Sequence, residues 1–324
     1  MIPSYVSRRW QERGYSEAQA RAYYEPDQAT REDLLALHNG GLLSLHEEGG
    51  WTRLPPLKRG DVAKLSFTSP LQKIQVFEDS GITSVRLNDT IQFEGREHQY
   101  HYEMMVAVPL SLLLRPRRVL ILGGGFGLAA HMALHFDEVE TIHVVELDPH
   151  VIRLAQETRS LRKINGKSLL HPKVKVFRQD AFQFVEQDSP GYDLIVYDCD
   201  LTATRQSDSL SLEMLLAFFT NLPLRLSPGG ALSMRVPIDS GHMDMVEAAE
   251  VARAQPVVGG ELERAAALAR SFWPDCFLFE FLSLYSGREL MVLAFPDHRP
   301  QVQRRLAGAS QTCHRLLEEL FPAP

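Results

Sequence analysis

Residues 118–127 read Arg-Val-Leu-Ile-Leu-Gly-Gly-Gly-Phe-Gly, an apolar run that ends in four glycines within five residues. Glycines let the backbone turn tightly and approach a ligand, and a helix that follows presents free N–H groups. The stretch therefore predicts a buried strand, a Gly-rich turn over 123–127 and a helix through about His135. A tight strand–helix corner without a ligand is the alternative interpretation of the glycines taken alone.

Outward from this turn, apolar strand-like segments alternate with helical ones. We expect strands over residues 141–146, 174–177, 192–198 and 231–236, with helices over 149–158 and 212–226. Strands separated by helices imply right-handed crossovers and a parallel sheet, so the fold class is α/β with a Rossmann-like sheet. Residues 277–284 and 290–295 are candidate additional strands, and a C-terminal helix is expected near 300–320.

Before the Gly-rich turn, the apolar residues repeat along the sequence with a different period. Apolar and polar residues alternate from about 63 to 96, with turn residues at 79–81 and 88–89, which predicts a small antiparallel sheet. A helix is expected over 100–114, and the first 60 residues carry helical signals. The predicted organisation is a helical N-terminal extension over 1–60, a small β-domain over 61–98 and a Rossmann-like catalytic domain over 99–324.

Composition narrows the class of protein. The 324 residues are 44% hydrophobic and 23% charged, and 34 Lys and Arg against 41 Asp and Glu give a net charge of −7. This balance argues against a surface built mainly for nucleic acid, although a local basic patch is compatible with it. The three cysteines have no zinc-type spacing, and no apolar run approaches the roughly 20 residues of a membrane span. We expect a cytoplasmic protein without a secretory signal, a metal, a nucleic-acid partner or a membrane partner.

Acidic residues stand where the predicted strands end. Glu146 follows the Gly-rich turn by about 20 residues, the spacing at which a carboxylate accepts from ribose hydroxyls. Asp180, followed by Ala181, can accept from an exocyclic adenine amine, and Asp198 and Asp200 end the next strand. Ligands of open α/β sheets bind beyond the carboxyl ends of the strands, so the set predicts a nucleoside-bearing cofactor. Each carboxylate alone would equally suit a solvated strand end.

The glycine pattern selects among such cofactors. The GGGFG run differs from the dinucleotide pattern GxGxxG, and no Walker lysine follows it. S-adenosylmethionine (SAM) needs ribose and adenine contacts but no pyrophosphate cradle. Ser227-Pro228-Gly229-Gly230, before the fifth strand, is also common in SAM-dependent transferases.

The ordered motifs resemble the spermidine synthases, the polyamine aminopropyltransferases, over about residues 69–236. The similar segments are Ser69–Gln72 (family S-x-Y-Q), Leu87–Gln92 (L-D-G-x-x-Q), Tyr100–Met104 (Y-H-E-M), Gly123–Gly127 (G-G-G-D-G-G), Glu146–Asp148 (E-I-D), Asp180-Ala181 (D-A or D-G) and Asp198–Asp200 (D-S-S-D-P). The resemblance implies a SAM-dependent transferase sheet behind a small β-domain, SAM or decarboxylated SAM as co-substrate, and a homodimer. Together with the strand-end pattern, it implies donor contacts at Gln72, Gln92, Gly123, Gly124, Gly125, Phe126, Glu146, Leu147, Asp180, Ala181 and Asp198.

Departures from the family pattern fall on the side that would face a polyamine. Phe126 replaces the acidic residue of G-G-G-D-G-G, and the D-x-x-D pair has become Asp198-x-Asp200. A dicationic acceptor needs several carboxylates, because a buried unpaired ammonium is costly. We therefore expect an altered acceptor site, and Phe126 would also tolerate a donor that carries a carboxylate.

The predicted chemistry is displacement at the SAM sulfonium. Asp198 or Asp200 is the candidate base, assisted by Tyr102 or His101; a structural carboxylate and an ordinary helix histidine are the alternatives. Three functions stay open. The first transfers the three-carbon arm to a small-molecule acceptor, or cyclises it, and releases methylthioadenosine. The second is a methyltransferase that acts on a small nucleophile, and the third is a non-catalytic nucleoside-binding scaffold.

Overall fold

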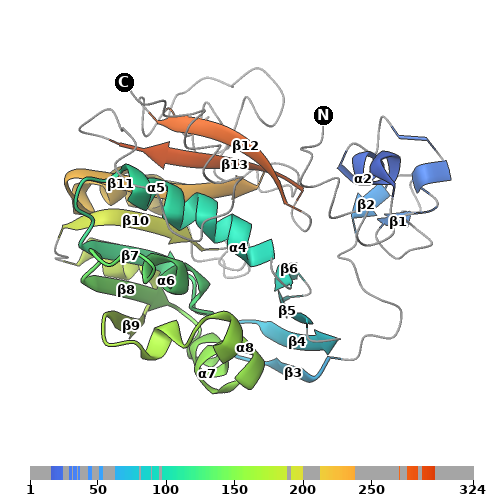
Figure 1. Ribbon diagram of the computed structural model, residues 1–324, viewed down its shortest axis with the longest axis horizontal. Coiled ribbons are helices and arrows are strands. Elements are labelled where there is room, and N and C mark those ends of the chain that lie inside the picture. The colour runs from blue at the N-terminus through green and yellow to red at the C-terminus, as the bar shows by residue number, and fades with distance from the viewer. Residues whose placement is uncertain are drawn as a thin grey trace. The chain divides into compact units, whose positions relative to one another are not determined.

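The computed structural model describes only part of the chain. The described residues are 16–24, 29–30, 32–34, 36, 43–45, 51–53, 63–79, 82–88, 90–94, 97–187, 191–199, 212–237, 270, 276–283 and 287–295. The chain divides into two compact units: Met1–Gly95 with Phe281–Glu289, and Arg96–Glu280 with Leu290–Pro324 (Figure 1). The C-terminal helix expected near 300–320 lies outside the described residues.

The first element that the structure describes in the first unit is the predicted helix α2 (Glu17–Tyr24). Ser16 Oγ accepts from Gln19 N at 3.1 Å, and Gln19 Oε1 accepts from Ser16 N at 2.8 Å, a reciprocal cap that starts the helix. Residues 32–34 and 36 are also helical, whereas β1 (Leu43–Leu45) and β2 (Trp51–Arg53) pair as antiparallel strands within the expected helical extension. A pairing between two three-residue strands leaves too short a pattern for period-two alternation to predict.

The predicted small antiparallel sheet is confirmed. Its strands are β3 (Leu65–Thr68), β4 (Lys73–Asp79), β5 (Ile82–Leu87) and β6 (Thr90–Glu94), in the order β3-β4-β5-β6. Ile74, Val76 and Val85 are almost fully buried, and Val76 pairs directly with Val85. Alternation along each strand thus places the apolar side chains on one covered face.

The predicted Rossmann-like sheet has the strand order β12-β13-β11-β10-β7-β8-β9 and lies in the second unit except for parts of β12 and β13 (Figure 1). The strands are β7 (Arg118–Gly123), β8 (Thr141–Glu146), β9 (Val174–Arg178), β10 (Tyr192–Asp198), β11 (Leu226–Pro237), β12 (Phe277–Ser283) and β13 (Gly287–Ala294). The pairs from β11 through β10, β7 and β8 to β9 are parallel. Residues 119–122 of β7 are entirely buried, as expected for a parallel strand covered on both faces.

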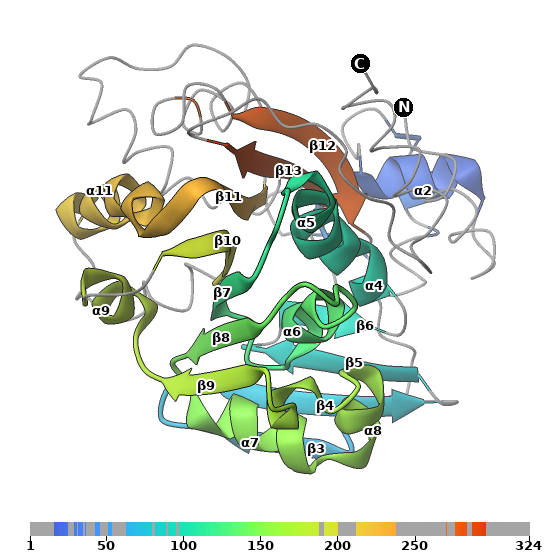
Figure 2. The same ribbon diagram turned by 60° about the vertical axis from the view of Figure 1, so that its left-hand side comes forward.

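Helices cover both faces of this sheet. They are α4 (Glu97–Tyr102), α5 (Val108–Leu112), α6 (Leu128–Ala133), α7 (Pro149–Glu157), α8 (Arg159–Ile164), α9 (Ala181–Glu186) and α11 (Leu212–Asn221), with 3₁₀ turns η3 (Ser168–Leu170) and η4 (Leu222–Arg225). Figure 2 shows α5 and α6 on one face, and α9 and α11 on the other. None of the described helices is long and apolar enough to cross a membrane.

The helix expected over 100–114 is interrupted by a π-helical turn, η2 (Glu103–Ala107). Val108 N donates to Glu103 O, a bond that spans five residues instead of four. Pro109 follows at once; it has no N–H, and its ring would clash with the carbonyl four residues earlier in an ordinary helix. The wider turn relieves that conflict, and such π turns are frequent at functional sites.

Strand β11 starts five residues earlier than expected, at Leu226. Tyr192 pairs with Leu226 but Leu194 pairs with Ala231, so the Ser-Pro-Gly-Gly segment forms an irregular insertion within the strand pairing. Gly229 has a φ of +75° there, which suits glycine.

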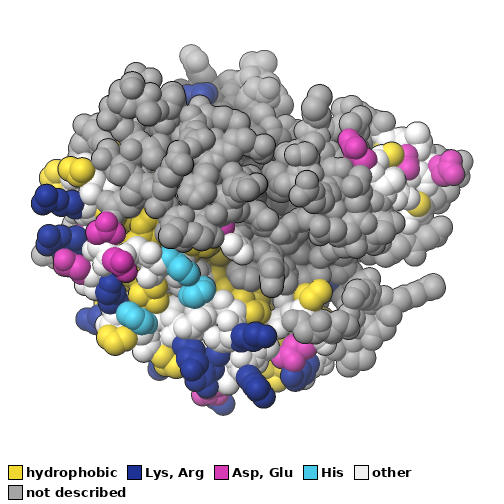
Figure 3. Space-filling view, viewed as in Figure 1, with side chains coloured by type: hydrophobic (Ala, Val, Ile, Leu, Met, Phe, Trp, Pro, Cys, Tyr) yellow, Lys and Arg dark blue, Asp and Glu magenta, His cyan; other side chains and the backbone are white. Residues whose placement is uncertain are grey.

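Basic side chains gather over α7 and α8 in the space-filling view (Figure 3). Residues 153–178 contain eight Lys and Arg against one Glu, in a chain whose net charge is −7. Arg162 and Lys163 occupy the last turn of α8, where a positive charge is favoured by the helix dipole. The local basic patch that the overall charge allowed is therefore present.

Candidate active site

The Gly-rich turn lies directly against the end of β10. Gly123 pairs with Asp198 across β7 and β10, and its φ is +85°. A Cβ at Gly123 would stand 2.4 Å from the carbonyl oxygen of Asp198, so only glycine fits. Gly124 has more room, since its added Cβ would lie 2.9 Å from Ile121 Cγ2 and 3.3 Å from Asp198 Oδ2. The two strand ends predicted to form one site are therefore in contact.

Two buried side chains that the sequence analysis missed, Asn165 and Ser168, donate hydrogen bonds to the backbone of the Gly-rich turn. Asn165 Nδ2 donates to the carbonyl oxygens of Phe126 (2.9 Å) and Ala155 (3.1 Å). Ser168 Oγ donates to the carbonyl oxygen of Gly127 at 2.6 Å. Asn165-Gly166 is a recognisable turn pair, but no local signal names its distant partners.

Glu146, at the end of β8, closes the other side of the turn. Its Oε2 accepts from Gly125 N at 3.1 Å, and its Oε1 accepts from Asp148 N at 2.9 Å. Burial raises the pKa of the Glu146 carboxyl to about 7, against the opposing effect of these two hydrogen bonds. The predicted ribose acceptor thus lies beside the glycines.

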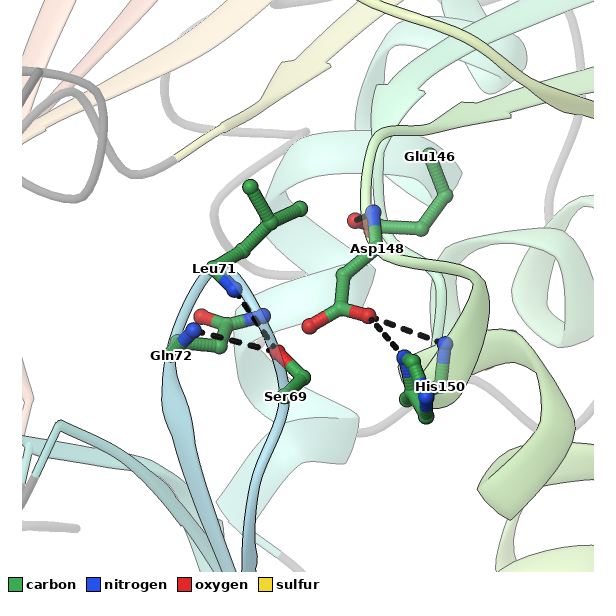
Figure 4. Close-up of polar contacts among 6 residues, drawn as sticks. All are labelled: Ser69, Leu71, Gln72, Glu146, Asp148 and His150. Atoms are coloured by element: carbon green, nitrogen blue, oxygen red, sulfur yellow. Dashed lines mark hydrogen bonds and ion pairs between the residues drawn. The ribbon is translucent and has the colours of Figure 1, made fainter.

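The two residues that follow Glu146 differ in burial and in role. Asp148 is buried and caps α7: its Oδ1 accepts from His150 N at 2.9 Å and from His150 Nδ1 at 3.1 Å (Figure 4). Leu147, between the two acidic residues, is 42% exposed. An exposed apolar side chain next to the proposed ribose acceptor is consistent with the predicted donor contact.

Asp198 is held by a tyrosine that comes from α4. The Tyr102 hydroxyl donates to Asp198 Oδ2 at 2.9 Å. His101 Nε2 lies 3.9 Å from Asp198 Oδ1, and the His101 ring meets the Tyr102 ring edge to face with centroids 4.8 Å apart. Burial, followed by the charge and hydrogen bond of Asp198, raises the pKa of the Tyr102 hydroxyl well above its ordinary value. Tyr102 therefore stays a neutral donor to the carboxylate.

The remaining predicted residues fall into separate places. Asp180 caps α9, with its Oδ1 accepting from Phe182 N at 2.7 Å, and Ala181 begins that helix. Phe126 is 8% exposed, so the position where the family has an acidic residue is a buried aromatic side chain. Asp200 lies outside the described residues.

Gln72 and Gln92 belong to the first unit. Gln72 immediately precedes β4, where Ser69 Oγ accepts from the backbone N of Leu71 and of Gln72, both at 3.1 Å (Figure 4). Gln92 lies within β6 and is half-buried. Gln72 thus lies next to the small sheet and Gln92 within it, and their contact with the donor stays a prediction.

One cation near Tyr102 was not predicted. Arg235 follows Met234 on β11, and its positive charge acts on the Tyr102 hydroxyl, lowering the pKa of that group against the larger effects that raise it. Within the part of the chain that the structure describes, no three His, Cys, Asp or Glu side chains gather into a possible metal site.

Comparisons with known proteins agree with this arrangement. Residues 97–255 match the model of the spermine/spermidine synthase domain. The chain is 37% identical over 168 residues to a polyamine aminopropyltransferase of Oceanobacillus iheyensis, covering 52% of this chain and 32% of that protein. It is 37% identical over 130 residues to polyamine aminopropyltransferase 2 of Aquifex aeolicus, covering 40% and 26%. The matched region thus spans between a quarter and a third of the length of these curated relatives.

Solved structures share the fold. The spermidine synthase of Thermotoga maritima matches with a TM-score of 0.58 and 19% identity over 85% of this chain and 88% of that one. A spermidine synthase in complex with the transition-state analogue AdoDATO matches with a TM-score of 0.60 and 18% identity, over 87% and 92%. The Gly-rich turn, the strand-end carboxylates, the matched domain and the shared fold lead to one conclusion: residues 97–255 of this chain form a domain of the spermine/spermidine synthase family.

Proposed function

We propose that this protein is an aminopropyltransferase-like enzyme, which moves the three-carbon arm of SAM or decarboxylated SAM onto a small nucleophile and releases methylthioadenosine. The observation that carries the proposal is the contact between Tyr102 and Asp198 at 2.9 Å, beside the Gly-rich turn. In this contact a neutral hydroxyl orients the Asp198 carboxylate at the edge of the sheet where ligands of this fold class bind.

The nucleoside half of the donor is assigned to the neighbouring strand ends. Glu146 is proposed to accept from the two ribose hydroxyls, replacing its present bonds from Gly125 N and Asp148 N. Because glycine has no side chain, the donor can approach the backbone of the Gly-rich turn closely. Asp180 is proposed to accept from the adenine amine through the carboxylate oxygen that does not cap α9.

The reaction is an in-line displacement that needs no covalent enzyme intermediate. The nitrogen lone pair of the acceptor attacks the terminal carbon of the arm next to sulfur. That carbon–sulfur bond breaks, its electron pair stays on sulfur, and the sulfonium becomes a neutral thioether. The proton lost by the attacking amine passes to Asp198, whose carboxylate Tyr102 orients. Positioning of the two reacting atoms supplies the rest of the acceleration.

Methyl transfer is the second candidate function, favoured by Phe126. The buried aromatic side chain stands where the family carries an acidic residue, so a donor bearing a carboxylate meets no repulsion there. Cyclisation of the arm is a variant of the first function in which the donor's own amine attacks.

Mass spectrometry of turnover separates these functions. The purified protein is incubated with SAM or with decarboxylated SAM, with and without a panel of small amines, beside the Asp198→Asn variant as control. Methylthioadenosine, lost in the variant, supports arm transfer, and its formation without added amine indicates cyclisation. S-adenosylhomocysteine would make the protein a methyltransferase. Absence of methylthioadenosine with every donor and acceptor contradicts the proposed function.

A further inference from the structure

The carboxyl ends of β10 and β11 carry opposite charges. Tyr197 of β10 pairs with Met234 of β11, so the register puts the next residues, Asp198 and Arg235, next to each other; Asp198 ends β10, and β11 continues to Pro237. This edge is the one at which the Gly-rich turn also lies. A guanidinium therefore accompanies the proposed base at the level of the ligand site.

Strand alternation puts these two side chains on the same face. Tyr197 and Met234 both belong to the apolar cluster that contains Phe182 and Phe218 of α9 and α11. Since successive side chains of a strand point to opposite faces, Asp198 and Arg235 point to the other face.

That other face is the one Tyr102 approaches. The π turn that follows Tyr102 packs on β11, and the Tyr102 hydroxyl reaches Asp198. The charge of Arg235 acts on the same hydroxyl. Asp198, Tyr102 and Arg235 thus form one group at the end where the transferred arm and the acceptor must meet.

This arrangement suits a zwitterion better than a polyamine. A guanidinium beside Asp198 repels an ammonium at close range and attracts a carboxylate, which its planar fork of donors can hold through two parallel bonds. Its five N–H donors allow such a contact in addition to those that Arg235 makes within the protein. The buried Phe126 adds no negative charge that would oppose a carboxylate.

We propose that Arg235 is a specificity-determining residue that binds the carboxylate of an α-amino-acid group on the molecule at the reacting end. The inference rests on the proposed function and names its substrate class. The group belongs either to the donor, as in SAM against decarboxylated SAM, or to an acceptor, as in ornithine against putrescine. Within each pair, the two molecules differ by a single carboxylate.

Calorimetric binding to the full chain tests the proposal without requiring turnover. The probes are SAM and decarboxylated SAM, and then ornithine and putrescine in the presence of saturating methylthioadenosine. Methylthioadenosine alone, which lacks the arm, is the control ligand. The proteins are the wild type, Arg235→Gln, and Arg235→Lys, which keeps the charge but not the fork.

In at least one pair, the wild type should bind the carboxylated member about tenfold or more tightly than its partner, the size expected for a charge-assisted hydrogen-bonded contact. Arg235→Gln should abolish that preference, Arg235→Lys should keep part of it, and neither should change the affinity for methylthioadenosine. The pair that shows the preference identifies donor or acceptor as the carrier of the carboxylate.

Two different failures are distinguishable. If methylthioadenosine binds but neither pair shows a preference, or a preference survives in Arg235→Gln, the assignment of Arg235 is wrong while the proposed function stands. If methylthioadenosine does not bind the wild type, the nucleoside site itself is wrong, and both proposals fall.

Discussion

Glu146 should make the stability of this protein fall as the pH rises through neutrality. Its carboxylate accepts from two backbone N–H groups, yet burial outweighs them and raises its pKa to about 7 from the ordinary 4.5. In the unfolded chain the carboxyl returns to its ordinary value. Between these two values the folded protein therefore binds more protons than the unfolded chain.

The size and sign of the effect follow from linkage. A difference of about 2.5 between the two pKa values corresponds to about 3 kcal/mol at any pH above both. The free energy of unfolding is unaffected by this group well below pH 4.5 and falls as the pH rises, and the full loss is reached above about pH 7. Glu146→Gln keeps the size of the side chain but cannot ionise, and its amide nitrogen cannot accept one of the two backbone N–H bonds, a cost that does not change with pH. Its stability relative to the wild type should rise by about 2–3 kcal/mol from about pH 5 to about pH 8.

Urea unfolding, followed by intrinsic fluorescence at four pH values over that range, measures this difference. Because the signal is the pH dependence, any constant cost of the amide cancels. Glu157→Gln is the matched control: it removes one negative charge from an exposed position on α7, ion-paired with Arg153, and leaves the Gly-rich turn untouched. A wild-type to Glu146→Gln difference that stays constant over the range would refute the reasoning, since Glu146 would then be ionised where it lies.

Four further changes test other parts of the site. Gly123→Ala should lower the free energy of unfolding by about 2–4 kcal/mol in urea titrations, because its Cβ meets backbone at 2.4 Å. Gly229→Ala is the control: Gly229 has a similar φ of +75° but nothing within 4 Å, so this variant should cost only about 1 kcal/mol. Equal costs would contradict the close contact at Gly123. Asn165→Ala should cost about 1–3 kcal/mol by leaving two buried carbonyl groups without their donor, and a loss below 0.5 kcal/mol, roughly the size of a surface substitution, would count against that role. Tyr102→Phe should slow methylthioadenosine formation about tenfold to a hundredfold without changing the affinity for methylthioadenosine, and an unchanged rate would remove the hydroxyl from the mechanism. Phe126→Asp should shift donor preference about tenfold toward decarboxylated SAM in competition binding, and an unaltered donor ratio would show that this position does not sense the donor's carboxylate.

Local pattern was sufficient for the regular parts of the fold. Strands β5, β8 and β10 begin and end where the sequence predicts, because their side chains repeat with period two or form a short buried run between turn residues. The Gly-rich turn and Glu146 were predicted as neighbours, because the carboxyl ends of adjacent parallel strands meet at one edge.

The prediction was incomplete where contacts with segments distant in the sequence decide the local structure. The π turn before Pro109 and the irregular start of β11 depend on how a helix and a strand adapt to what they pack against. The pairing of β1 with β2 is likewise a contact between short segments with weak propensity of their own.

The sequence by itself determined the α/β class, the small antiparallel sheet and the candidate residues at the strand ends, because periodicity and turn chemistry act over a few residues. Only the tertiary structure decided which of these residues touch. It joined Tyr102 to Asp198 across 96 positions, brought Asn165 under the Gly-rich turn and placed Arg235 beside Asp198. Such contacts arise from the order and register of the strands, which bring distant segments together and which no local pattern encodes.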